Sequence, residues 1–167
     1  MIKIGKNLSE WSAYSCQPKT KDVLKEIIKE RISKEGTNCD LNDIDVSQIT
    51  NMSDLFYNSE FNGDISKWDV RNVEYMHYMF YKAEFNKDIS KWNVSNVENM
   101  YNMFCNSNFV GDISNWNVSN VKDMRTIFHG SKFNKDISKW DVSRVKFMDN
   151  AFDQSPLENN PPKWYKK

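Results

Sequence analysis

The sequence predicts an α/β repeat solenoid in which each 24-residue coil contributes a short parallel strand and a short helix, behind an N-terminal helical cap. Three observations predict this fold class. Tryptophans recur every 24 residues, phenylalanines and isoleucines recur at the same interval, and the apolar spacing within each unit changes partway along. Because one such unit cannot bury its own aromatic side chains, we expect successive units to stack and share a core.

Five consecutive units follow this period, at residues 37–60, 61–84, 85–108, 109–132 and 133–156. The last four units align over nearly their whole length, and the first fits the same frame of apolar positions. The equally spaced core positions are Trp68, Trp92, Trp116, Trp140 and Trp164; Phe61, Phe85, Phe109 and Phe133; and Ile65, Ile89, Ile113 and Ile137.

Each unit is expected to hold a strand followed by a helix. Trp68 and Val70 alternate with polar residues, as in a half-buried strand. From Val73 onward the apolar residues recur at spacings of three and four, which would place them on one helical face. Asn and Asp then supply a turn into the next unit. Parallel strands from coils about 4.8 Å apart would form a ribbon along one side.

Residues 1–36 are expected to form an N-terminal cap that contains an amphipathic helix at 20–35. Thr20 suits the N-cap position of this helix, and Gly36 suits its C-terminal end. The apolar face of the helix would comprise Val23, Leu24, Ile27, Ile28 and Ile32. The segment that precedes the helix would add Ile2, Ile4, Leu8, Trp11 and Tyr14 to the cap.

Residues 157–167 are expected to close the other end of the solenoid as a degenerate C-terminal cap. Pro161 and Pro162 cannot continue a regular coil, because proline lacks an amide donor and has a fixed φ. Trp164 keeps the 24-residue register, so we expect it to lie over the last unit.

The composition argues against several partners and locations. The 23 basic residues balance the 23 acidic ones, so no net field draws the chain to nucleic acid or an acidic membrane. No apolar run reaches the length of about 18 residues that spans a bilayer. The N-terminus lacks a secretory signal, and the three cysteines are odd in number and widely spaced. These features predict a cytoplasmic location with reduced thiols.

The sequence predicts no catalytic residue, no metal site and no cofactor. Motifs for nucleophilic catalysis, nucleotide binding or zinc are absent, and Cys105 has no obvious activating neighbour. His77 and His129 occupy different positions of the unit, and both are expected in solvent. One acidic position recurs at Asp64, Asp88, Asp112 and Asp136. Each coil supplies one such carboxylate, whereas calcium takes about six to eight oxygens, so hydrogen bonds within each turn are the favoured explanation.

The pattern W-[DN]-V-S-N-V-x-x-M-x-x-M-F, followed by F-N-x-D-I-S, recurs across residues 37–156. It resembles the repeat of BspA-like leucine-rich-repeat surface proteins, including the Mycoplasma-lipoprotein type. This resemblance implies a leucine-rich-repeat-like solenoid that binds other macromolecules and has no catalytic residues. Members of that family are typically exported, so the resemblance suggests the cell surface, whereas the missing export signal suggests the cytoplasm.

Positions that vary between units predict where a partner binds. The first candidate is the outer helical face, which carries Tyr57, Tyr75, His77, Tyr78, Tyr81 and Tyr101. Tyrosine is a favoured anchor of protein interfaces. The alternative is the strand face, with Lys67, Asp69, Arg71, Lys91, Asn93, Asn117 and Lys139.

The sequence therefore predicts a monomeric, non-catalytic module that recognises a protein partner through one face of the solenoid. The short, leaderless architecture leaves open an alternative, an intracellular and phage-encoded inhibitor of a bacterial enzyme or defence complex. A nucleic-acid partner is disfavoured, because the tyrosine-rich unit at 61–84 has four acidic and three basic residues.

Overall fold

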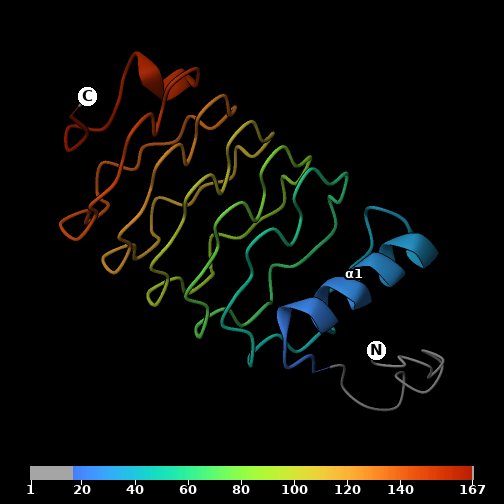
Figure 1. The fold of residues 1–167 in the computed structure, drawn as a ribbon. Helices are drawn as coiled ribbons and strands as arrows, with labels where there is room; N and C mark the ends of the chain where they lie inside the picture. Colours follow the sequence, from blue (N-terminus) through green and yellow to red (C-terminus); the bar gives the residue numbers. More distant parts are fainter. Residues whose placement is uncertain (1–16, 167) are drawn as a thin grey trace.

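The computed structural model describes residues 17–166, which form a column of coils stacked side by side (Figure 1). The described part contains one α-helix, α1 (Lys21–Glu35), and one short 3-10 helix, η2 (Pro156–Glu158). Between them the chain consists of turns joined by isolated β-bridges, and no described residue belongs to a strand. The prediction of an α/β, leucine-rich-repeat-like solenoid with one strand and one helix per coil is therefore wrong.

The predicted helix of each coil fails because every second amide bonds to the next coil. Met76 N donates to Asn99 O at 3.0 Å, and Tyr78 N donates to Tyr101 O at 2.9 Å. Alternate amides close short turns instead, as Met79 N does by donating to Met76 O at 3.2 Å. An α-helix requires each amide to bond four residues back within its own segment, which these bonds prevent.

Left-handed residues also interrupt the segment that was expected to be helical. Positive φ angles occur at two positions four residues apart in every coil: Asp54 and Asn58, Tyr78 and Lys82, Asn102 and Asn106, Thr126 and Gly130, Asn150 and Gln154. A helix requires φ near about −60° at every residue. Turns closed between residues i and i+3 still return side chains three residues apart to one side, which explains why the apolar spacing imitated a helix.

The predicted strand is likewise built from turns. Trp68 N donates to Ile65 O at 3.1 Å, and Val73 N donates to Val70 O at 3.0 Å. One residue per coil makes a parallel β-bridge, in the row Asn51, Tyr75, Asn99, Asp123 and Phe147. This row lies in the half of the coil that was expected to be helical, so the expected strand ribbon is absent from the described residues.

The predicted core positions are confirmed, because they form continuous buried rows through the stack. Trp68, Trp92, Trp116 and Trp140 are each 4% exposed, and the phenylalanines of the repeat are fully buried. The ring of Trp92 stacks on that of Trp68 at 6.4 Å and on that of Trp116 at 6.5 Å. Its Nε1 donates to Ile65 O in the preceding coil at 3.2 Å, so each indole joins two coils.

The N-terminal helix lies where the sequence predicted it. Thr20 Oγ1 accepts from Val23 N at 3.3 Å at the start, and Gly36 N donates to Ile32 O at 2.9 Å at the end. Three residues of the predicted apolar face are buried: Leu24, Ile27 and Ile28. Val23 is 37% exposed, so its assignment to that face was wrong. The predicted cap residues Ile2, Ile4, Leu8, Trp11 and Tyr14 lie outside the described residues.

The C-terminal segment covers part of the last coil. Trp164 continues the tryptophan row, and its Nε1 donates to Ile137 O at 3.1 Å. Its ring lies 5.8 Å from that of Phe152, and Tyr165 meets the same ring edge-on at 4.8 Å. Trp164 is half-buried, because no coil formed by residues 17–166 covers its outer side.

Candidate functional site

The six residues predicted on the outer helical face lie together on the surface of the turns, and we call them the tyrosine-rich face: Tyr57, Tyr75, His77, Tyr78, Tyr81 and Tyr101. Tyr57 stacks on Tyr81 with ring centroids 4.8 Å apart. Tyr78 meets Tyr81 edge-on at 5.5 Å and Tyr101 edge-on at 5.0 Å. The rings thus form one continuous cluster across three coils.

The cluster is partly exposed to solvent, and its less exposed rings pack against one another. Tyr57 is 49% exposed and Tyr75 is 37% exposed, whereas the other four side chains are half-buried. His77 fills the space between Tyr75 and Tyr78, at 6.4 Å and 6.2 Å from their rings. Its Nδ1 is buried and has no hydrogen-bond partner among the described residues. The expectation that His77 would lie in solvent was therefore wrong, and half-buried His129 departs from it in the same way.

Two cations extend this aromatic surface. Lys82 Nζ lies 5.4 Å from the centre of the Tyr81 ring. The Arg125 guanidinium lies 5.0 Å from Tyr101 and 5.1 Å from Phe147, which is 50% exposed. Sequence reasoning missed Arg125 and Phe147. Phe147 could have been found, because it occupies the position that Tyr75 holds in its own unit.

The Tyr78 hydroxyl is the most strongly perturbed titrating group of the face. Its hydrogen bond with Tyr101 and its burial raise the pKa of Tyr78 to about 12. Like an ordinary phenol, Tyr78 is neutral at physiological pH and offers a hydroxyl rather than a charge. The face presents aromatic edges and hydroxyl groups, which suits recognition by packing and hydrogen bonding.

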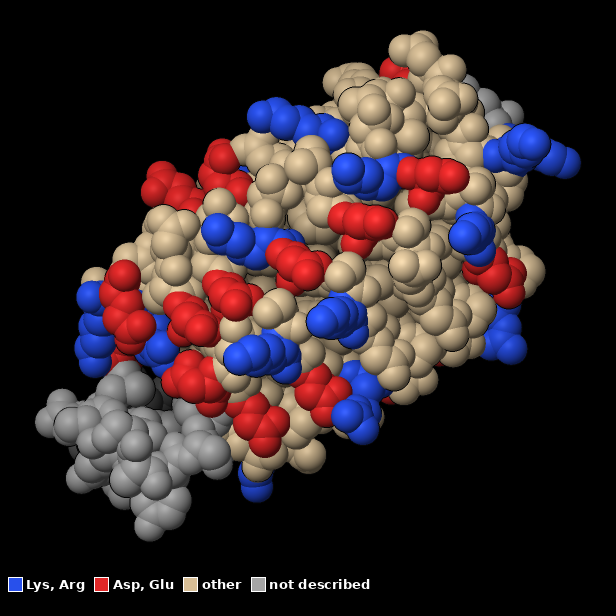
Figure 2. Space-filling view, turned by 180° about the vertical axis from the view of Figure 1, so that it is seen from behind, with Lys and Arg blue, Asp and Glu red and all other residues tan. Residues whose placement is uncertain are grey.

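The residues of the alternative face lie on turns rather than on strands. Their side chains are exposed or half-exposed: Lys67, Asp69, Arg71, Lys91, Asn93, Asn117 and Lys139. Arg71 Nε pairs with Asp69 Oδ1 at 2.8 Å, which neutralises part of this surface. Basic and acidic side chains are interspersed on the face of the molecule that Figure 2 shows.

The recurring aspartates act as turn acceptors, which confirms the explanation favoured from the sequence. Asp88 Oδ1 accepts from Ser90 N at 2.8 Å, and the same bond recurs at Asp64, Asp112 and Asp136. This bond lowers the pKa of Asp88 and of the other three carboxyls. Across residues 17–166, no three His, Cys, Asp or Glu side chains gather as metal ligands would.

These aspartates predict a loss of stability in acid. Their folded pKa values lie below the unfolded value of about 3.9, so their stabilisation is complete above that pH and disappears as the pH falls through the folded values. We expect the urea midpoint to fall between about pH 4 and pH 2. A variant with all four aspartates changed to Asn keeps an acceptor, as Asn93 does for Ser95 N at 3.1 Å. It should show a shallower pH dependence; an unchanged slope would contradict this assignment.

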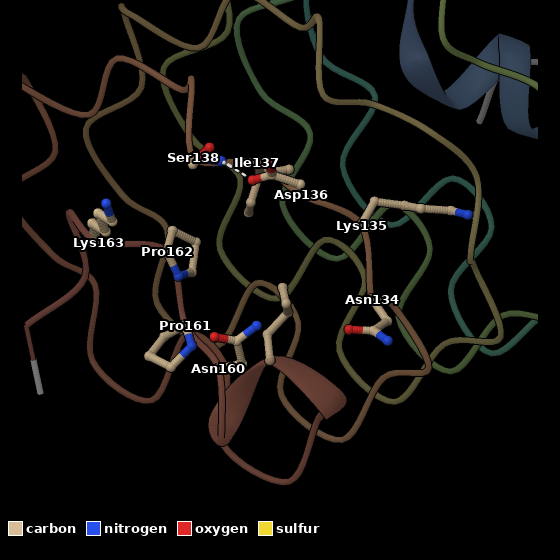
Figure 3. Close-up of a pocket in the computed structure, with 10 residues that line it drawn as sticks. Asn134, Lys135, Asp136, Ile137, Ser138, Asn160, Pro161, Pro162 and Lys163 are labelled. Carbon is tan, nitrogen blue, oxygen red and sulfur yellow. Dashed lines mark hydrogen bonds between the residues drawn. The ribbon is translucent and has the colours of Figure 1, made fainter.

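Three further features of the described residues bear on function: the Cys105 thiol, one hollow near the C-terminus and the length of the helices. Burial raises the pKa of the Cys105 thiol to about 11, so it is protonated at neutral pH. A hollow of about 450 Å³ separates the last coil from the C-terminal segment (Figure 3). Its walls include Lys135, Pro162 and Lys163, and its carboxylate, Asp136, already accepts from Ser138 N at 2.9 Å. In the part of the chain that the structure describes, no helix is long and apolar enough to cross a membrane.

Comparison with known proteins identifies the family. No curated protein and no solved structure matched the chain. The family described as "Mycoplasma protein of unknown function, DUF285" matches residues 25–130 and 105–166, two overlapping ranges that leave out little besides the N-terminus. The repeat that builds the tyrosine-rich face is therefore the repeat of a known family, and the chain belongs to the DUF285 family.

Proposed function

We propose that this chain is a non-catalytic module that binds a protein partner through the tyrosine-rich face. The observation that carries the proposal is the continuous ring cluster, in which Tyr57 and Tyr75 are the most exposed members. Tyrosine and arginine are enriched among the residues that dominate binding energy, and Arg125 borders the cluster.

The packing of the cluster supports binding with a small loss of conformational freedom. Tyr78 is fixed between Tyr81 and Tyr101, and Tyr57 is fixed on Tyr81. Ordering a free side chain at an interface costs about 0.5–1.5 kcal/mol, and rings that are already packed avoid much of that cost. The buried aromatic rows beneath them hold the coils in register, so the face is formed before a partner arrives.

The repeat pattern supports a closer relation between this DUF285 member and the BspA-like surface proteins. Proteins with that repeat act by binding macromolecules, which agrees with a module without reacting groups. We include the relation to BspA-like proteins in the proposal. We also propose that the chain is monomeric and binds a single partner.

The test replaces tyrosines by the residues that other coils carry at the same positions. Tyr75 aligns with Asn99, and Tyr78 aligns with Asn102, so the double variant Tyr75→Asn and Tyr78→Asn uses side chains that these turns already accept. Tyr78 has a φ of 58°, a conformation that Asn tolerates better than Tyr. We expect unchanged stability and a partner affinity at least roughly tenfold weaker. Capture from cell lysate, then calorimetric titration of the purified partner, measures the effect.

A matched control addresses the alternative face. Lys67 and Lys91 align with Asn115, so the double variant Lys67→Asn and Lys91→Asn also introduces residues that another coil carries at the same position. We expect this variant to bind as the wild type does. Loss of binding in the lysine variant alone would show that the partner binds the alternative face. Full binding by both variants would show that the partner binds neither face.

A further inference from the structure

Arg125 is a surface arginine whose position is fixed by a single carboxylate. Asp123 Oδ1 accepts from Arg125 N at 3.1 Å and from Arg125 Nε at 3.0 Å, and Asp123 Oδ2 accepts from Arg125 Nη2 at 2.6 Å. The Asp123 side chain is 11% exposed, whereas the Arg125 side chain is 44% exposed. The backbone and the guanidinium of Arg125 are therefore both held to a nearly buried acceptor, while much of the side chain faces solvent.

Two aromatic rings hold the same guanidinium from the neighbouring coils. Its Cζ lies 5.0 Å from the centre of the Tyr101 ring, in the preceding coil, and 5.1 Å from the centre of the Phe147 ring, in the following coil. A free arginine side chain loses rotamer entropy when a partner orders it. Arg125 is already ordered by the carboxylate and the two rings, so a group that binds it incurs little of this cost.

The guanidinium of Arg125 retains hydrogen-bond donors that the described residues do not use. A guanidinium carries five N–H groups, and Asp123 accepts from two of them, on Nε and Nη2. The others, on Nη1 and Nη2, make no hydrogen bond with any of residues 17–166. Nη1 is also not among the buried unpaired atoms of this range, so it is accessible to solvent. One N–H of Nη1 and the remaining N–H of Nη2 form an outer edge that a planar carboxylate can accept from with both oxygens.

We propose that Arg125 binds a carboxylate of the protein partner through this outer edge of Nη1 and Nη2. The inference rests on the proposed function, because Tyr101 belongs to the tyrosine-rich face and a partner on that face also reaches Arg125. The carboxylate is that of an aspartate or glutamate side chain, or of the C-terminus of the partner. The partner therefore combines side chains that pack on the tyrosine rings with one acidic group at the border of the face.

The surroundings of Arg125 suit a single negative charge on the partner. Asp123 and, more weakly, Asp149 raise the pKa of Arg125. A carboxylate on the outer edge lies nearer to the guanidinium than to Asp123, which engages a different edge, so attraction exceeds repulsion. Recognition of phosphate groups commonly uses clusters of arginines. Here the cation three residues earlier, Lys122, is already paired with Glu98 at 2.7 Å, which favours a carboxylate over a phosphate.

The test titrates the full chain with small molecules that carry the proposed group. N-acetyl-glutamic acid α-amide supplies a side-chain carboxylate, N-acetylglycine supplies a terminal carboxylate, and N-acetyl-glutamine amide is the uncharged control. NMR spectra at constant ionic strength follow the Arg125 Nε–H signal and the backbone amides of Tyr101 and Phe147. We expect saturable shifts with a carboxylate in the millimolar range and none with the control. The carboxylate that saturates at the lower concentration identifies the source.

Two variants separate the outer edge of Arg125 from a general attraction to positive charge. Arg125→Ser introduces the residue of Ser53, whose turn has the same backbone hydrogen bond, at 2.9 Å. Lys122→Thr introduces the residue of Thr50 and removes a charge of the same sign from the same coil. We expect the first variant to abolish the shifts and the second to retain them. If Arg125→Ser fails to fold, Arg125→Lys keeps the charge without the paired donors, and its affinity should fall at least roughly tenfold.

Three results would overturn the inference. The first is the absence of a saturable shift up to about 100 mM of either carboxylate. The second is an equal loss in the variants at Arg125 and Lys122, and the third is saturation by inorganic phosphate at a lower concentration than by both carboxylates. Because the titration uses no partner, its failure rejects the role of Arg125 alone. Retained partner binding by the variant Tyr75→Asn and Tyr78→Asn instead rejects the tyrosine-rich face.

Discussion

Trp92→Ala is expected to unfold the entire stack rather than one coil. The indole is 4% exposed and stacks between Trp68 and Trp116, so its removal leaves a cavity that spans two interfaces between coils. The change also removes the hydrogen bond from the indole to Ile65 O, which links the two coils. Truncation of a buried tryptophan costs roughly 3–5 kcal/mol, a large share of the stability of a domain of this size. Urea denaturation followed by circular dichroism measures the loss.

Trp164→Ala provides the matched control for this prediction. Trp164 holds the same position of the repeat and donates the same bond, to Ile137 O, but it is half-buried and has a coil on one side only. Its loss should cost clearly less than that of Trp92, and the remaining coils should stay folded. Equal destabilisation by both variants would mean that stability does not arise from the interfaces between neighbouring coils.

Gly63→Ala is expected to have the second largest effect, because a backbone atom occupies the space of the new methyl group. A Cβ on Gly63 would lie 1.9 Å from Cys39 O and 2.7 Å from the Phe61 ring. The approach is close because Asn62 N donates directly to Thr37 O at 2.8 Å, which draws the two backbones together. The carbonyl cannot rotate away as a side chain could. We expect a loss of about 1–3 kcal/mol or more.

Gly111→Ala separates this steric effect from the general effect of replacing a glycine. Gly111 holds the same repeat position, but its Cβ would meet only the Phe109 ring, at 2.7 Å. In that coil, Val110 N bonds to the side chain of Asn86 at 2.9 Å, so no backbone carbonyl approaches. In thermal melting, Gly63→Ala should have a lower Tm than Gly111→Ala. The reverse order would show that the contact with Cys39 does not limit the position.

The sequence predicted the period, the core positions and α1, because each depends on apolar side chains whose burial follows from composition and spacing. It did not predict the backbone. The spacing of Val73, Met76, Met79 and Phe80 fits a helix and also fits successive four-residue turns, and apolar periodicity cannot separate the two. A usable signal was present: Asn102 and Asn106 lie four residues apart where a helix was expected, and Asn readily adopts left-handed φ.

The candidate site was partly predictable for a similar reason. Positions that vary between units on an otherwise constant repeat indicated the tyrosines, and the structure places their rings in contact. Phe147 could have been identified from its repeat position, whereas the contact of Arg125 with Tyr101 and Phe147 depends on how neighbouring coils lie against each other.

The hydrogen bonds between coils recur with a period of 24 residues, which has a consequence for how such chains can evolve. Deletion of residues 85–108 would join Glu84 to Phe109, a junction of the same residue types as Glu84 and Phe85. Met76 N would then find Asp123 O where it now finds Asn99 O. Whole units can therefore be gained or lost by recombination without changes to the core residues. The length of the stack, and with it the area of its faces, can change in steps of one coil while the contacts between the remaining coils are kept.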